Sequence, residues 1–281
     1  MLYMKRYGRP GFAGEYHPEK NPDLSTSPDG ASRLCDSALF AWEDRHTHAR
    51  KMTNQMKRIW RNCAVGGLLL LGAASCSTTG EHKRTIELFN GKDLAGWQQV
   101  LADPAVKMSQ VWSVENGILV CQGTPLGFLY RGPAVTNFRL IVEYRWAPGS
   151  EPGNSGIFSR IGEPLKALPH TVEVQLKHGD AGDVMGLQGK PIAGGQPRFF
   201  DVKAHPAAGD IAGIKKMLDA ENPPGQWNRV EILAQGPRYQ VWINGKLVNE
   251  ADGVEVSSGP VGVQSEGGVI QFRRVTLTPL D

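Results

Sequence analysis

The sequence predicts an all-β fold, an antiparallel sandwich or barrel, and three observations predict it. From residue 86 onward, short stretches alternate apolar and polar residues between turn signals. Helical periodicity is nearly absent, and only Ile211 to Asn222 could form a turn or two of helix. The chain also contains 34 Gly and 19 Pro, which suits a turn-rich β protein. One domain of about 200 residues is an ordinary size for this class.

Asn-Gly pairs predict two β-hairpins. The runs around Asn116-Gly117 and Asn244-Gly245 alternate on both sides of the pair, and Asn-Gly suits the positive φ angles of a type I′ turn. Six further strand candidates are "FRLIVEYRWAP", "GIFSRIG", "TVEVQLKH", "NRVEILAQG", "GPVGVQSEG" and "VIQFRRVTLTPL". Residues 179–201 and 202–224 interrupt this spacing, so we expect two long loops that overhang one sheet.

The N-terminal region differs from the rest of the chain. Residues 1–51 show no sustained period, and we expect them to be unstructured or to reflect an over-extended start. Residues 52–75 have the form of a signal peptide, in which positive charges precede the apolar run "AVGGLLLLGAA" and small residues follow it. This run is shorter than the roughly 20 residues that span a bilayer. We therefore expect export rather than a membrane span.

The stretch "LGAASCS" resembles a bacterial lipobox, which implies that Cys76 is lipidated. The expected mature chain then has a linker over residues 76–84 and one domain over residues 85–281. The expected location is the cell envelope, as an outer-membrane lipoprotein facing the periplasm that contacts the membrane through its lipid only. Simple secretion stays open as an alternative.

Charge and cysteine content exclude several functions. The net charge is +3 and no basic stripe is interleaved with aromatic residues, so no nucleic acid partner is expected. Of the 4 cysteines, only Cys121 follows Cys76, which argues against a disulfide framework or a zinc–thiolate site.

Six motifs in a fixed order carry a resemblance to a known family. They are "LFNGKDLAGW", "GNSGIFSR", "VEVQL", "PPGQWNRVEI", "INGKLV" and "GPVGVQSEGGVIQFRRVTLTPL". In this order they resemble the 3-keto-disaccharide hydrolase domain family. The resemblance implies a concanavalin A-like jelly roll of two antiparallel sheets with a sugar-binding concave face. It also implies action on glycosides or oligosaccharides already oxidised to a ketone at C3.

The strand "VEVQL" indicates which chemistry is available. Its polar face carries one carboxylate, Glu173, whereas retaining glycosidases use two carboxylates about 5–5.5 Å apart. A ketone at C3 acidifies the hydrogen on C2, so one base, an enolate-stabilising group and an acid could eliminate the C1 substituent before water adds. We therefore expect a 3-keto-glycoside hydrolase or lyase. The alternatives are a non-catalytic lectin-like module and an ordinary glycoside hydrolase.

The predicted catalytic residues are Glu173, His178 and Arg160. Glu173 is expected to act as base or metal ligand, and His178 to move protons near neutral pH. Arg160 is expected to hold a keto oxygen or to pair with Glu173, and both readings place it near Glu173. A solvated carboxylate, a surface histidine and a structural arginine stay open as alternatives.

Further residues are predicted to bind substrate or metal. Asn154, Ser155, Gln175 and Lys177 are the substrate-binding candidates. Asp180 and Asp183 are spaced like oxygen ligands in a loop and, with Glu173, are candidates for holding a divalent ion. No organic cofactor is expected.

Overall fold

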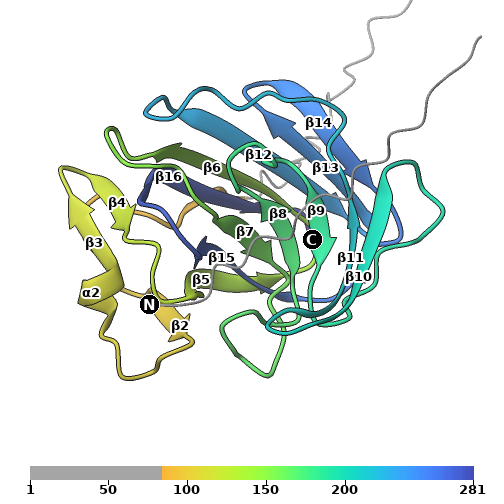
Figure 1. Ribbon diagram of the computed structural model, residues 1–281, viewed down its shortest axis with the longest axis horizontal. Coiled ribbons are helices and arrows are strands. Elements are labelled where there is room, and N and C mark those ends of the chain that lie inside the picture. Colours follow the sequence, from red (N-terminus) through yellow and green to blue (C-terminus); the bar gives the residue numbers. More distant parts are fainter. Residues whose placement is uncertain (1–83) are drawn as a thin grey trace, which may run out of the picture. The chain divides into compact units, whose positions relative to one another are not determined.

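The computed structural model describes residues 84–281, and these form a β-sandwich (Figure 1). Two eight-stranded sheets, each antiparallel throughout, account for nearly all regular structure. The predicted all-β, concanavalin A-like jelly roll is thus confirmed. The predicted signal peptide over residues 52–75 and the predicted lipidation site Cys76 lie outside the described residues.

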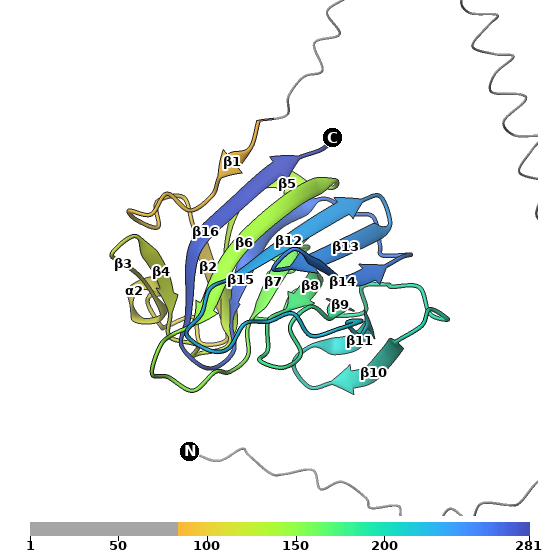
Figure 2. The ribbon, with the colours of Figure 1, turned by 90° about the horizontal axis from the view of Figure 1, so that it is seen from above.

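The first sheet has the order β14-β13-β12-β6-β16-β4-β3, with β1 paired to β16. Figure 2 shows β16, β6, β12 and β13 side by side across this layer. Its strands are β1 (Ile86–Glu87), β3 (Trp112–Glu115), β4 (Ile118–Cys121), β6 (Phe138–Trp146), β12 (Asn228–Gln235), β13 (Arg238–Ile243), β14 (Lys246–Ala251) and β16 (Ile270–Pro279).

Both Asn-Gly hairpins are confirmed in this first sheet. They join β3 to β4 and β13 to β14. The turn residues Asn116 and Asn244 both have φ of 52°, and the glycines that follow have φ of 79° and 78°. These are the left-handed angles that a type I′ turn requires.

The second sheet has the order β10-β11-β9-β8-β7-β15-β5-β2. Its strands are β2 (Gln98–Leu101), β5 (Gly127–Val135), β7 (Gly156–Ser159), β8 (Val172–Gln175), β9 (Val184–Gly186), β10 (Phe199–His205), β11 (Gly209–Ile214) and β15 (Gly259–Ser265). The prediction of two long loops after residue 179 was therefore wrong in part, because β9, β10 and β11 extend this sheet beyond β8.

Helix is scarce in the described residues. The one α-helix in residues 84–281 is α2 (Met108–Val111), whereas the helix predicted over Ile211 to Asn222 is absent because its first four residues belong to β11. Within this part of the chain, no helix has the length and apolar character to cross a bilayer.

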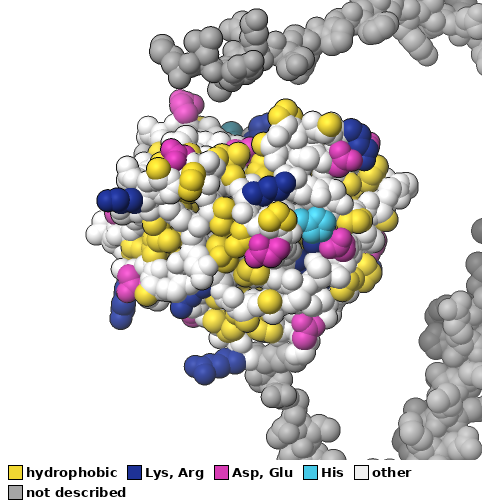
Figure 3. Space-filling view, turned by 90° about the horizontal axis from the view of Figure 1, so that it is seen from below, with side chains coloured by type: hydrophobic (Ala, Val, Ile, Leu, Met, Phe, Trp, Pro, Cys, Tyr) yellow, Lys and Arg dark blue, Asp and Glu magenta, His cyan; other side chains and the backbone are white. Residues whose placement is uncertain are grey.

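Two apolar clusters hold the fold together. The larger one lies between the sheets and includes Val172, Val174 and Leu176, the apolar face predicted for β8. The second cluster comprises Phe128, Phe158, Ile161, Leu168, Leu187 and Ala208. The side chain of Phe158 therefore points away from the main core, onto the outer face of the second sheet. Figure 3, a view from below, shows hydrophobic side chains in several patches on the face that it presents.

Candidate functional site

Glu173 occupies the outer face of the second sheet, as predicted, but it is buried rather than wet. The side chain is 3% exposed, and its Oε1 atom has no hydrogen-bond partner. Its direct neighbours across the strands are Phe158 on β7 and Met185 on β9, which share its face because opposed residues in a ladder point the same way. The carboxyl group thus lies among apolar side chains.

A missing side chain on β7 makes room for this carboxyl group. A Cβ atom on Gly156 would lie 2.8 Å from Glu173 Cδ, so the Glu173 side chain fills the space above the glycine. Burial raises the pKa of Glu173 well above its ordinary value, and the nearby charge of Glu266 raises it further. A buried acid without a hydrogen bond costs folding free energy, and such groups are common at functional sites.

Two more side chains in or next to this sheet have buried polar atoms without hydrogen bonds. The register of β7 with β15 continues from Gly262↔Phe158 and Val263↔Ile157, which sets Gln264 opposite Gly156. Gln264 is fully buried, and neither its Oε1 nor its Nε2 makes a hydrogen bond. The Oδ1 atom of Asn154, just before β7, is likewise buried and unpaired. Buried polar groups are normally paired, so this cluster points to a ligand that supplies the partners.

Glu266 adds a second carboxyl group to the same region. It follows β15, two residues beyond Gln264, and it is exposed. Even so, desolvation raises its pKa, while Gln264 and Lys177 act to lower it. Exposure together with desolvation is expected of a side chain surrounded by protein but open on one side. The Gln264 amide lies close enough to act on the pKa of Glu266, but no hydrogen bond joins the two side chains.

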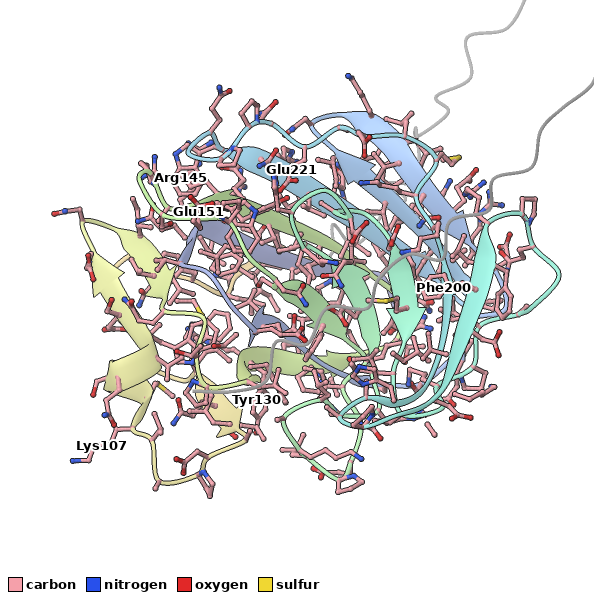
Figure 4. All side chains as sticks on the ribbon, viewed as in Figure 1. Lys107, Tyr130, Arg145, Glu151, Phe200 and Glu221 are labelled. Atoms are coloured by element: carbon pink, nitrogen blue, oxygen red, sulfur yellow. The ribbon has the colours of Figure 1, made fainter. Side chains whose placement is uncertain are left out.

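His178 lies at the rim, held by a residue that the sequence did not single out. Its Nδ1 is 2.9 Å from Glu221 Oε2. Glu221 Oε1 accepts hydrogen bonds from the side chains of Tyr144 and Trp146 at 2.9 and 3.2 Å. Figure 4 shows Glu221 in the segment that leads into β12, in the upper part of the view. His178 is therefore anchored to the loop before β12, and no hydrogen bond or ion pair joins it to Glu173 within residues 84–281.

Arg160 does not reach Glu173, and the expectation that the two lie together was wrong. Its Nη1 donates to Glu255 O at 2.8 Å and its Nη2 to Gly236 O at 2.7 Å. Nε and Nη2 also donate to the Thr136 carbonyl, and the guanidinium stacks 5.0 Å from the centre of the Tyr239 ring. A φ of 51° ends the strand alternation at Arg160 and turns the side chain toward the main core.

The substrate-binding candidates differ in availability. Ser155 is buried and its hydroxyl donates to Gln264 O at 2.8 Å, so it serves the sheet. Gln175 Oε1 accepts from the backbone amides of Leu176 and Lys177 at 3.0 and 2.9 Å, which leaves its amide nitrogen for a ligand. Lys177 is exposed and pairs with Asp180 at 3.1 Å. Together with Asn154, Gln175 and Lys177 stay candidates.

The predicted metal ligands do not come together. Asp183 is buried, pairs with Lys215 Nζ at 2.7 Å and accepts the Lys216 amide at 2.8 Å. Asp180 pairs with Lys177. Within residues 84–281 no group of three or more His, Cys, Asp or Glu side chains could hold a metal ion. These residues do not fit a metal site with Glu173, and a metal requirement stays a prediction.

The sequence reading missed Gln264, Glu266 and Glu221. A signal for the first two exists, because "GVQSEGG" alternates and sets Gln264 and Glu266 on one face at the end of a strand. Glu221 carries no such signal, since it lies in an irregular segment and reaches His178 only through the fold.

The fold defines a class, the concanavalin A-like jelly-roll proteins. A putative glycosyl hydrolase from Parabacteroides distasonis ATCC 8503 aligns with a TM-score of 0.51 and 22% identity, over 70% of this chain and 94% of that one. The carbohydrate-binding module CBM66 from Bacillus subtilis aligns with a TM-score of 0.45 and 16% identity, over 65% of this chain and 95% of that one. At 22% identity the likeness to the Parabacteroides distasonis protein concerns the fold alone. A search of curated proteins found no match.

The family follows from a direct match. The model of the 3-keto-alpha-glucoside-1,2-lyase-like domain matches residues 84–278, and the chain belongs to this family. The resemblance stated from the motifs is thereby confirmed, and the function is carbohydrate-related.

Proposed function

We propose that the protein cleaves glycosides whose sugar ring carries a ketone at C3. In this reaction a base removes the proton from C2, the C1 substituent leaves with a proton on its oxygen, and water then adds to the unsaturated ketone. Family membership supports the substrate class. The observation that carries the proposal is Glu173, an acid that is 3% exposed, has no hydrogen-bond partner and lies beside the unpaired amide of Gln264.

The chemistry fits the residues because proton transfers are the main demand on the protein. The ketone already activates the hydrogen on C2, so the reaction needs no nucleophilic side chain. Glu173 carries one of the two proton transfers in this proposal, and general acid–base catalysis of this kind contributes about 10²–10⁴-fold. The unpaired amides of Gln264 and Asn154 are suited to sugar hydroxyl groups, which both donate and accept hydrogen bonds.

A turnover assay tests this function. The wild-type protein is expected to cleave 3-keto-glucosides and to leave the unoxidised glucosides intact, and Glu173→Gln is expected to lose about 10²-fold or more in kcat/KM. Glu115→Gln is the matched control, since Glu115 is exposed on β3 of the other sheet. Equal cleavage of both sugars would indicate an ordinary glycoside hydrolase.

A non-catalytic binding module is the second candidate. One feature favours it, a hollow of about 250 Å³ on the outer face of the first sheet lined by Arg229, Glu231, Trp242 and Gly245. An aromatic side chain next to charged groups is a common platform for sugar rings. Sugar binding without turnover in the same assay would support this candidate.

Adding a chelator tests the metal prediction, since a loss of turnover that divalent ions restore would support it.

A further inference from the structure

The turn that follows β15 fixes the backbone of Glu266 next to the cluster around Glu173. Gly267 O accepts the Asn154 amide at 2.9 Å. A Cβ on Gly153 would lie 2.7 Å from Gly268 N, so the two glycine-containing segments pack without room for a side chain. Gly267 and Gly268 have φ of 139° and 74°, angles that favour glycine. Glu266 is therefore held against the segment that leads into β7.

The two carboxyl groups have opposite surroundings. Glu173 is 3% exposed, its strand neighbours are Phe158 and Met185, and it accepts no hydrogen bond. Glu266 is exposed and has the Lys177 ammonium near it. Burying a charge without a partner is far more costly than exposing one, so one proton shared by the pair belongs on Glu173 and the charge on Glu266.

Desolvation is the main cause of both raised pKa values. The charge of Glu266 raises the pKa of Glu173 further, and the charge of Lys177 acts to lower the pKa of Glu266. Asp183, the residue just before β9, forms an ion pair with Lys215. The buried Gln264 amide presents both a donor and an acceptor to the same region.

We propose that Glu266 is the second proton-transfer residue of this site, acting as the base while Glu173 carries the proton and acts as the acid. This inference rests on the proposed function and revises the expectation that Glu173 is the base. It follows the rule that two carboxyl groups in contrasting environments divide the acid and base roles.

The steps balance without a cofactor. The Glu266 carboxylate takes the C2 proton, the C2 electron pair forms the C1=C2 bond, and the C1–O bond breaks. Glu173 gives its proton to the departing oxygen. Water then adds to C1 and loses a proton to the Glu173 carboxylate, while Glu266 returns its proton to C2. The sum is hydrolysis, and both residues end in their starting states.

Two measurements on Glu266→Gln test the pair. In the turnover assay kcat/KM should fall about 10²-fold or more, and the pH profile should lose its acidic limb, because the base that must be ionised is gone. In a ¹³C NMR titration of the labelled Glu carboxyl groups, the midpoint of Glu173 should move to lower pH when the neighbouring charge is removed. Glu115→Gln should change neither.

The outcomes separate the two proposals. Turnover within threefold of the wild type, or an unmoved Glu173 midpoint, overturns the role of Glu266. If the wild type fails to cleave 3-keto-glucosides, the proposed function fails, and the titration still decides whether the two groups form a pair. Lys177→Met is the second variant, because loss of its positive charge should move the acidic limb of the profile to higher pH. An unmoved limb contradicts the inference.

Discussion

Glu173 is a strand residue whose burial lowers the stability of the fold and raises the pKa of its carboxyl group. Periodicity placed it correctly on the face opposite Val172 and Val174. Its burial could not be predicted, because it depends on Phe158 and Met185 from neighbouring strands and on the missing side chain at Gly156. The result is a raised carboxyl pKa that no neighbouring donor corrects.

The raised pKa of Glu173 makes stability depend on pH in a predictable direction. Below the ordinary value of 4.5 both folded and unfolded chains are protonated. As pH rises, the unfolded chain loses this proton first, so the folded state loses stability until pH passes the raised folded pKa. Glu173→Gln cannot ionise and should escape this loss.

Thermal unfolding at several pH values checks this. At pH about 4 the Tm values of wild type and Glu173→Gln should agree, and at pH about 8 the variant should melt at least ~2 °C higher, as expected for ~1 kcal/mol in a domain of this size. A variant that melts lower than the wild type at pH about 8 would mean that the Glu173 carboxylate is stabilised by a partner.

At the scale of elements, local sequence signals predicted the hairpins, whereas pairing between residues distant in the chain determined several other strands. The Asn-Gly turns of β3–β4 and β13–β14 depend on two residues each, and the sequence alone identified them. Strands β9, β10 and β11 have no such signal, since their glycines and polar residues become strands by pairing successively onto the edge of β8. Alternation also failed at Arg160, where one left-handed residue redirects the side chain.

The pairing of β7 with β8 makes Gly156 a sensitive position. Gly156 lacks a positive φ, so its backbone accepts alanine, and the added methyl group meets Glu173 instead. Gly156→Ala should displace the carboxyl group and lower turnover on the order of 10²-fold, because small errors in the position of a reacting group are costly.

A double-mutant cycle and a control isolate the cause. In a Glu173→Ala background, Gly156→Ala should have little further effect on turnover or on Tm, since the group it collides with is gone. Gly194→Ala is the control, because a Cβ there makes only an ordinary contact of 3.7 Å with Phe199. Full turnover in Gly156→Ala would show that the Glu173 position does not matter.

For the whole molecule, motif order predicted the family and the sandwich, whereas the site required the three-dimensional structure. Glu173 lies on β8, about 90 residues before Gln264 on β15 and Glu266 just after it, and only the pairing of both strands with β7 brings these residues together. The sheets are also held together by groups that the sequence assigned to chemistry. Arg160 connects three separate segments through the carbonyl groups of Thr136, Gly236 and Glu255.

Arg160→Met should therefore act on stability rather than on turnover. The change leaves these three carbonyl groups without a donor, at about 1 kcal/mol or more each, so the free energy of unfolding should fall by about 3 kcal/mol or more. That is a large part of the 5–15 kcal/mol that a domain of this size usually has. Denaturant unfolding measures this loss, and kcat/KM per folded molecule should stay within threefold of the wild type.

Arg139→Met is the control, because it removes an exposed ion pair with Glu231 and should cost under about 1 kcal/mol. If Arg160→Met kept its stability and lost turnover, Arg160 would belong to the reacting site and the structural role argued from its hydrogen bonds would fail.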